Sequence, residues 1–278
     1  MSAATDSGRG PDNGGDDDGN DLLAVLKLIA ERAGKTILAY YAEGEDIEVR
    51  EKADSSPVTE ADEAAEAIIL EFLRNLTPEI PVVSEESFEA GTVPDVSGGR
   101  FWLVDPLDGT KEFLNRNGEF TVNIALIEDG RPVAGVVHAP AMAMTWVGVA
   151  ASEGKPSRAL FSQTDQPEME IRVREAPEEG ITVVASRRHG SGDELERYLA
   201  AYKVKDRVSA GSSVKLCLLA SGRADLYPRF GRTMEWDTAA GHAVLAAAGG
   251  RVETAEGAPL TYAKPGFENP YFIAKGKL

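Results

Sequence analysis

This sequence has little cysteine, no long apolar run and no excess of positive charge. The single cysteine among 278 residues, Cys217, cannot form an internal disulfide, which fits a reducing compartment. Lys and Arg total 29 against 46 Asp and Glu, a formal net charge of −17. Binding a nucleic acid through its phosphates needs a basic surface, so no nucleic acid is expected as a partner.

No apolar run approaches the roughly 20 residues that span a bilayer. The first residues also lack the basic region and apolar stretch of a signal peptide. We therefore expect a cytoplasmic protein with no integral membrane segment. Residues 1–20 are rich in Asp and Gly and have no large apolar side chain after Met1, which predicts a disordered acidic tail.

What is present predicts a globular protein of the α/β class in two parts. The first part, residues 21–160, is expected to be α+β, and the second, residues 161–278, a smaller α/β half. Apolar side chains recur at helical spacing over residues 22–41, after a cap at Asn20 or Asp21. This spacing predicts a long first helix.

The rest of the first part should place a second helix on a largely antiparallel sheet. That helix is expected to begin at Thr59 and to stop at Pro78. Asp129-Gly130 is a strong signal for a hairpin turn between two strands. The predicted strands are 80–83, 101–104, 120–127, 133–137 and 144–149.

In the second part, short apolar runs alternate with helical patterns. A strand is predicted at 181–185, and helices are predicted at 193–201, 214–220 and 237–248. The last helix is rich in Ala and ends at Gly249-Gly250, a good helix stop. This alternation is typical of an α/β unit.

The segment from Trp102 to Lys111 is the part of the sequence most informative about function. An apolar strand runs into Asp105, and Pro106 is expected to force a turn that brings Asp108 beside it, with the Leu107 carbonyl between them. Mg²⁺ prefers such oxygen ligands. Backbone N–H groups of Gly109 and Thr110, at a helix start, would suit a phosphate. For an isolated acid after a strand, a capped turn is the simpler alternative.

Two further acidic segments lie at the ends of predicted elements. Glu85 and Glu86 follow the strand 80–83, and Asp237 opens the Ala-rich helix. Alone, the glutamates would suggest a solvated loop and Asp237 a helix cap. Loops at element ends gather into sites on a rigid scaffold, however. Together with Asp105 and Asp108, these acids predict one magnesium site for hydrolysing a phosphate ester.

The sequence does not match the other catalytic and binding motifs that were considered. Asp105 and Asp108 are three residues apart, which does not fit an EF-hand, and residues 148–155 deviate from a P-loop at two points. A G-x-S-x-G elbow is missing. His138, His189 and His242 lack metal-ligand spacing and are expected to be structural, and Cys217 is expected to lie in the core.

Residues 105–110 and 236–241 resemble the two signatures of the inositol monophosphatase superfamily of lithium-sensitive phosphatases. The chain is most similar to the bacterial 3′(2′),5′-bisphosphate nucleotidases of that superfamily, through residues 105–113, 116–126 and 227–231, and the similarity covers nearly everything from residue 21 to the end. The resemblance implies a layered αβαβα fold. It also implies removal of the 3′-phosphate from adenosine 3′,5′-bisphosphate, a by-product of sulfate assimilation, or from its 5′-phosphosulfate analogue.

The resemblance further implies two or three Mg²⁺ ions and their ligands. One ion would activate the attacking water and another would stabilise the leaving oxygen. Thr110 would orient the water with Glu85, and Asp62 would support Thr110. A capping box with Thr59 is the alternative role for Asp62. The implied ligands are Glu85, Asp105, the Leu107 carbonyl, Asp108 and Asp237.

Substrate choice depends on a second set of residues. Inositol phosphatases have a glutamate where this chain has Arg229, and a guanidinium can bind a second phosphate that a carboxylate would repel. A surface ion pair is the alternative for Arg229. The other substrate-binding residues that the resemblance implies are Asp108, Gly109, Thr110, Ser212, Ser213, Lys215 and Asp237.

Rival functions stay open from the sequence. One is a relaxed phosphatase for inositol 1-phosphate or fructose 1,6-bisphosphate, and the other is an inactive regulator that binds a nucleotide or a metal. The substrate partner is expected to be a small nucleotide bisphosphate, and the chain a monomer or homodimer. The resemblance also allows peripheral association with the cytoplasmic face of the inner membrane.

Overall fold

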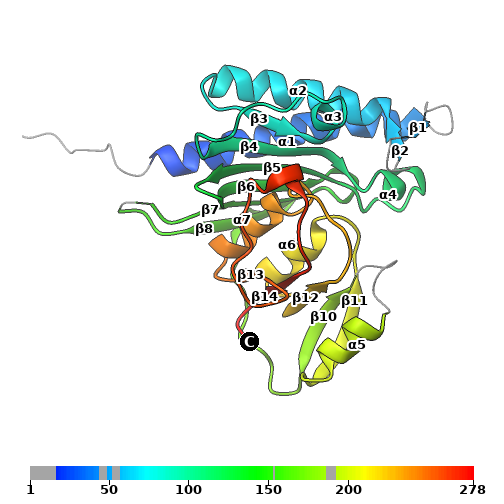
Figure 1. Ribbon diagram of the computed structural model, residues 1–278, viewed down its shortest axis with the longest axis vertical. Coiled ribbons are helices and arrows are strands. Elements are labelled where there is room, and N and C mark those ends of the chain that lie inside the picture. Colours follow the sequence, from blue (N-terminus) through cyan, green and yellow to red (C-terminus); the bar gives the residue numbers. More distant parts are fainter. Residues whose placement is uncertain (1–16, 44–48, 52–56, 153, 186–191) are drawn as a thin grey trace, which may run out of the picture.

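A computed structural model describes residues 17–43, 49–51, 57–152, 154–185 and 192–278. These residues form five layers, helix, sheet, helix, sheet and helix, stacked from top to bottom in Figure 1. The αβαβα fold implied by the resemblance is therefore confirmed. None of the helices described is both long and apolar enough to cross a membrane. The helices are α1 (Asp17–Glu43), α2 (Glu60–Leu76), α3 (Glu85–Glu89), α4 (Thr110–Leu114), α5 (Asp193–Leu199), α6 (Val214–Ala220) and α7 (Ala239–Ala247), with 3₁₀ turns at Pro140–Met142 and Pro265–Phe267.

The outer helical layer consists of α1 and α2, which cover one face of the first sheet. The apolar stripe of α1 is buried, as its spacing predicts. The predicted cap is wrong, because α1 begins at Asp17, inside the segment expected to be a disordered tail. Residues 1–16 of that tail lie outside the described residues. For α2, Thr59 is the N-cap and the helix ends at Leu76, close to the predicted limits.

The first sheet has seven strands in the order β3-β4-β5-β6-β7-β8-β9, antiparallel except for the β3–β4 pair. The predicted hairpin at Asp129-Gly130 is confirmed, since it joins β5 to β6. A separate two-stranded ribbon pairs β1 (Val49–Glu51) with β2 (Pro57–Thr59). The sheet consists of β3 (Val82–Ser84), β4 (Arg100–Asp108), β5 (Thr121–Glu128), β6 (Arg131–Ala139), β7 (Met144–Val149), β8 (Arg158–Gln163) and β9 (Met169–Glu170).

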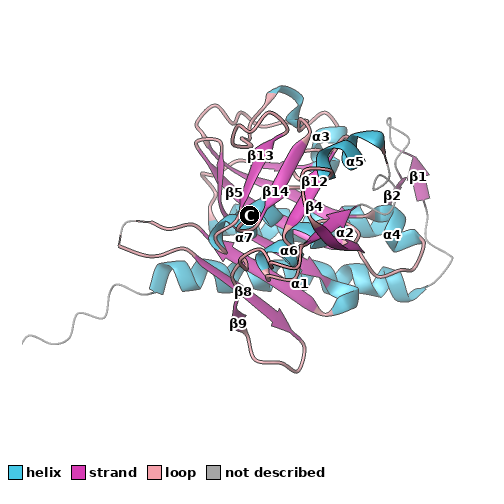
Figure 2. Cartoon of the chain, turned by 90° about the horizontal axis from the view of Figure 1, so that it is seen from below, coloured by secondary structure: helices cyan, strands magenta, loops and turns pink. Residues whose placement is uncertain are grey.

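The second sheet has five strands in the order β11-β10-β12-β14-β13. Of these the sequence predicts only β10, together with α5, α6 and α7. Helix α5 covers the outer face through a cluster that includes Leu195 and Leu199, and Figure 2 shows this half from below. The strands are β10 (Ile181–Ala185), β11 (Val204–Ser209), β12 (Leu226–Arg229), β13 (Arg251–Thr254) and β14 (Phe272–Lys275).

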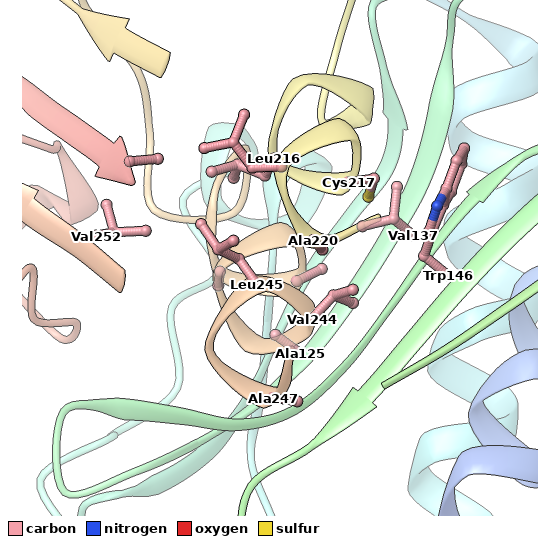
Figure 3. Packing of buried hydrophobic residues seen from close by; sticks show 14 of the residues in the cluster. Ala125, Val137, Trp146, Leu216, Cys217, Ala220, Val244, Leu245, Ala247 and Val252 are labelled. Atoms are coloured by element: carbon pink, nitrogen blue, oxygen red, sulfur yellow. The ribbon is translucent and has the colours of Figure 1, made fainter. Parts of the chain in front are cut away.

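The two sheets share one core around α6 and α7, and Figure 3 shows Leu216 and Cys217 of α6 beside Val244 and Leu245 of α7. Helix α7 lies so close to the first sheet that a Cβ at Gly148 would be 2.7 Å from Val244 Cα. The predicted boundary at residue 160 falls within the first sheet, and the division into two halves stays a prediction. Strand β8 crosses it, and the sheet ends with β9 at Glu170.

Two buried histidines make the stability of this fold depend on pH. His138 Nδ1 is 2.8 Å from Thr145 Oγ1, and His242 Nδ1 is 2.9 Å from Tyr262 Oη, so both are structural, as predicted. Burial lowers the pKa of each imidazole to about 4. The neutral form is favoured in the folded state. Its stabilising contribution is complete above the unfolded pKa of about 6.5 and is lost as the pH falls toward 4.

Lowering the pH from 7 to 6 is therefore expected to cost on the order of 0.5–1 kcal/mol of unfolding free energy for each histidine. Urea unfolding of wild type and His242→Gln at both pH values tests this. The difference between the two proteins isolates the contribution of His242 from that of every other titrating group. An identical pH dependence in both would contradict the prediction.

Candidate active site

A cavity of about 290 Å³, here called the acid cavity, brings together all the predicted metal ligands. Glu85 comes from the start of α3, Asp105, Leu107 and Asp108 from the end of β4, and Asp237 from the segment before α7. The predicted gathering of three separated acidic segments at element ends is thus found in the structure. Its lining residues are Glu85, Asp105, Leu107, Asp108, Gly109, Thr110, Lys111, Glu112, Arg232 and Asp237.

The backbone between the two central acids differs from the predicted turn. Strand β4 continues through Pro106 to Asp108, and its pairing with β5 shifts register between Asp105 and Asp108. Pro lacks an N–H donor, so a bulge is where a paired strand tolerates it. The bulge still places Asp105 and Asp108 in one cavity, because the shift re-aims the side chains that follow it.

Asp62 makes contacts that suit both of the roles that the sequence leaves open. Its Oδ2 accepts hydrogen bonds from Thr59 N at 2.8 Å and Thr59 Oγ1 at 2.6 Å, which is the capping arrangement. Its other oxygen, Oδ1, lies 3.3 Å from the hydroxyl of Thr110, which can donate to it. The acid is 1% exposed and does not line the acid cavity. It therefore stands behind Thr110, where it can orient that hydroxyl.

The electrostatics of the acid cavity favour a bound cation. The pKa of Asp108 is raised by burial, with Glu85 and Glu112 adding repulsion. The pKa of Asp237 is raised by burial too, and then by the charges of Asp108 and Glu85. A divalent cation would relieve this repulsion and keep the acids ionised.

Carboxylates and a carbonyl are also the donor set that suits Mg²⁺. Some of these oxygens are engaged with the protein, since Asp105 Oδ1 accepts from Leu107 N and Asp237 Oδ2 from Met234 N. Within the described part of the chain, no three acidic, His or Cys side chains already converge on one point. The residues are therefore of a kind that suits Mg²⁺, and they lie in one cavity.

A second cavity of about 230 Å³, here called the basic cavity, adjoins the first and shares Asp108, Lys111, Glu112 and Asp237 with it. It contains every residue outside the acid cavity that the sequence assigns to substrate binding. These are Ser212, Ser213, Lys215 and Arg229. The two predicted sets thus lie in neighbouring cavities with a common wall.

Ser213 contacts two acids of the wall that the two cavities share. Ser213 Oγ is 3.2 Å from Asp108 Oδ2 and donates to Asp237 O at 2.7 Å, so it links two predicted ligands. Asn123 Nδ2 donates to Ser213 Oγ at 2.9 Å and lies 3.5 Å from Asp108 Oδ2. Asn123 is not among the site residues predicted from the sequence. In the sequence it stands out only as a polar residue between Val122 and Ile124 in an apolar strand, and in the structure it is 1% exposed.

Two of the basic side chains that line this cavity, Lys215 and Arg229, have different surroundings. Lys215 is 8% exposed, and its Nζ donates to Ser212 O at 2.5 Å and lies 3.5 Å from Ala210 O. Burial lowers the pKa of Lys215 to about 8, although Asp108 opposes this. Arg229, at the end of β12, donates from Nη2 to Arg232 O at 3.1 Å. Its buried Nε has no hydrogen-bond partner among the described residues, so a donor is available for a ligand.

Histidine and cysteine contribute nothing to either cavity as described. His138 and His242 are packed elsewhere, and Cys217 is buried in the core, as predicted. His189 lies outside the described residues. The chemistry of the site therefore rests on carboxylates, hydroxyls, backbone groups and the basic side chains of Lys111, Lys215, Arg229 and Arg232.

A fold of this kind with an acid-lined cavity at its strand ends defines a class of metal-dependent phosphatases. The family model for the inositol monophosphatase family matches residues 18–271, so the chain belongs to that family. Its members are Mg²⁺-dependent phosphatases.

Particular relatives are similar over nearly the whole chain. The 3′(2′),5′-bisphosphate nucleotidase CysQ of Escherichia coli K12 is 48% identical over 252 residues, which cover 90% of this chain and 98% of that protein. CysQ of Haemophilus influenzae is 32% identical and covers 92% of this chain and 93% of its own. Among solved structures, CysQ from Bacteroides thetaiotaomicron has a TM-score of 0.76 at 38% identity, covering 93% of this chain and 98% of that one. An inositol monophosphatase of Thermotoga maritima, 24% identical and covering 93% of each chain, shares the fold with a TM-score of 0.68.

Proposed function

We propose that this protein is a Mg²⁺-dependent 3′(2′),5′-bisphosphate nucleotidase that removes the 3′-phosphate of adenosine 3′,5′-bisphosphate and releases AMP. The observation that carries the proposal is the pair of adjoining cavities with Asp108 and Asp237 in their common wall. The acid cavity suits the phosphate that is cleaved, and the basic cavity, with Arg229, suits the one that stays. The similarity to CysQ proteins supports this choice.

The ion-binding part of the proposal rests on the acid cavity. Glu85, Asp105, Asp108, Asp237 and the Leu107 carbonyl would hold two or three Mg²⁺ ions. Bound there, the ions would neutralise charge that develops on the phosphoryl group and lower the pKa of the attacking water.

The protein's own groups orient the reactants. Thr110 Oγ1 lies within reach of Asp62 Oδ1, and when its proton points there, its lone pairs can accept a hydrogen bond from the attacking water. Glu85 lines the same cavity and would accept one proton from that water as its oxygen attacks phosphorus. The bond from phosphorus to the 3′-oxygen breaks, and that oxygen takes up a proton to become the ribose hydroxyl.

A phosphate-release panel tests the proposed function directly. Adenosine 3′,5′-bisphosphate, its 5′-phosphosulfate analogue, inositol 1-phosphate and fructose 1,6-bisphosphate would each be assayed with and without Mg²⁺. We expect the highest kcat/KM for the nucleotide bisphosphate. A higher value for inositol 1-phosphate or fructose 1,6-bisphosphate would indicate a relaxed phosphatase, and release from none of them would indicate a binding protein.

Li⁺ should inhibit this activity at concentrations where Na⁺ does not. The expectation follows from the family signatures, because a small cation that occupies a Mg²⁺ position without its double charge leaves phosphoryl charge unneutralised. The measurement is phosphate release at fixed Mg²⁺ with LiCl or NaCl at equal ionic strength. Equal rates in the two salts, in a protein that still needs Mg²⁺, would contradict it.

A further inference from the structure

Two loops from different halves of the protein meet beside the common wall of the cavities. One loop, residues 115–120, connects α4 to β5, and the other, residues 210–213, connects β11 to α6. Glu119 is the point of contact. Its carboxylate Oε2 accepts a hydrogen bond from Gly211 N at 2.7 Å, and its backbone O accepts one from Ser212 Oγ at 2.7 Å.

The two loops lie as close together as their backbones allow. A Cβ at Gly211 would lie 2.9 Å from both Glu119 Cβ and Glu119 O, and a Cβ at Gly109 would lie 2.3 Å from Ser212 Oγ. Distances this short exclude a side chain at either glycine without movement of the loops. The 210–213 loop is therefore fitted against the loop that carries Glu119.

The conformation of the 210–213 loop needs such support. Ser212 has φ of +47°, a left-handed conformation that residues other than glycine seldom adopt. Its hydroxyl is also 2.9 Å from Asp108 O, next to its contact with Glu119 O. Ser213, the next residue, touches Asp108 and Asp237. The position of this loop thus sets the position of the wall between the cavities.

We infer that Glu119 is a positioning residue for the reaction: by accepting the Gly211 N–H, its carboxylate holds the 210–213 loop where Ser212, Ser213 and Lys215 meet the substrate. This inference rests on the proposed function. Glu119 itself lines neither cavity, so it acts through the loop. Hydrogen bonds to a carboxylate are stronger than neutral ones, which suits a contact that must hold a left-handed residue in place.

The predicted effect is on substrate affinity. Glu119→Ala removes the acceptor and should raise KM for adenosine 3′,5′-bisphosphate roughly ten- to a hundredfold, the range expected for one hydrogen bond to a charged group. Glu119→Gln keeps an oxygen acceptor in the same place and should stay within about threefold of wild type. The Mg²⁺ concentration for half-maximal activity should change less than KM does, because Glu119 lines no part of the acid cavity and acts on Asp108 and Asp237 only through the loop.

The experiment compares wild type, Glu119→Ala and Glu119→Gln in kcat, KM, Mg²⁺ activation and thermal midpoint. Glu128→Ala serves as the control, since the side chain of Glu128 forms a surface ion pair with Arg100, away from both cavities. Hydrogen exchange of the 210–213 amides in the protein alone adds a readout that needs no turnover, and it should be faster in Glu119→Ala only.

Three results would overturn the inference. They are an unchanged KM in Glu119→Ala, an equal rise in Glu119→Gln, or a lower thermal midpoint with no kinetic effect, which would make the contact purely structural. The proposed function fails separately, if wild type releases no phosphate from the nucleotide. In that case the same variants are judged on the ester that wild type does hydrolyse and on amide exchange.

Discussion

Replacing Asp105 by Asn should lower kcat at least about a hundredfold while the protein stays folded. Asp105 is 1% exposed in the acid cavity, so its charge acts at short range with little screening by solvent. An amide in its place weakens ion binding and leaves developing phosphoryl charge uncompensated. Losing one stabilising group of this kind costs roughly 10²–10³ in kcat.

The fold should tolerate this change for a specific reason. Asp105 Oδ1 accepts a hydrogen bond from Leu107 N at 3.1 Å, and the side-chain oxygen of Asn can accept the same bond. Asp129→Asn is a matched control that removes an acid from the hairpin turn, where φ of +48° suits Asn well. Activity over a Mg²⁺ titration, with thermal midpoints for both variants, is the measurement. Near-normal turnover of Asp105→Asn at saturating Mg²⁺ would remove Asp105 from the site.

Local sequence patterns predict the parts of the site that local structure determines. Asp105 and Asp108 follow an apolar run, and Thr59-x-x-Asp62 is a capping box that the structure contains. Such features depend on residues a few positions apart, so one segment is enough to reveal them. Pro106 lies in a bulge and not in the predicted turn. The predicted acids still lie in one cavity, because a bulge also re-aims side chains.

Contacts between distant segments cannot be predicted in the same way. Asn123 meets Ser213 from 90 positions away, and Glu119 meets Gly211 from 92. Nothing near Glu119 in the chain indicates that its carboxylate has a backbone partner, since its neighbours predict only a polar loop. The same holds for strands 204–209 and 226–229. Strand 204–209 is largely polar, and strand 226–229 contains Pro228. Both segments form strands because their backbone groups pair with those of neighbouring strands.

Arg229→Ala is expected to separate substrates that differ by a single phosphate. If Arg229 binds the phosphate that is not cleaved, the variant should lose roughly ten- to a hundredfold in kcat/KM on adenosine 3′,5′-bisphosphate. This corresponds to about 1.5–3 kcal/mol for a hydrogen bond between charged groups. On adenosine 3′-monophosphate, which lacks the 5′-phosphate, the loss should be several-fold at most. The structural reason is the buried Nε of Arg229, a donor without a partner among the described residues.

The comparison between the two substrates is needed because Arg229 also supports the protein. Its Nη2 donates to Arg232 O, close in sequence to Asp237, so truncation can disturb the acid cavity and weaken turnover of any ester. That disturbance affects both substrates equally and cancels in the ratio of their kcat/KM values. The loss should appear mainly in KM, because a contact made equally in the ground and transition states leaves kcat unchanged.

Two variants complete the measurement. Arg229→Lys keeps the charge but not the paired donors of the guanidinium, and it should fall between wild type and Arg229→Ala on the bisphosphate. Arg100→Ala removes a surface arginine that pairs with Glu128, and it should match wild type on both substrates. Equal losses on the two substrates in Arg229→Ala would mean that Arg229 does not bind the second phosphate. Recognition would then depend on Ser212, Ser213 and Lys215, whose side chains line the same cavity.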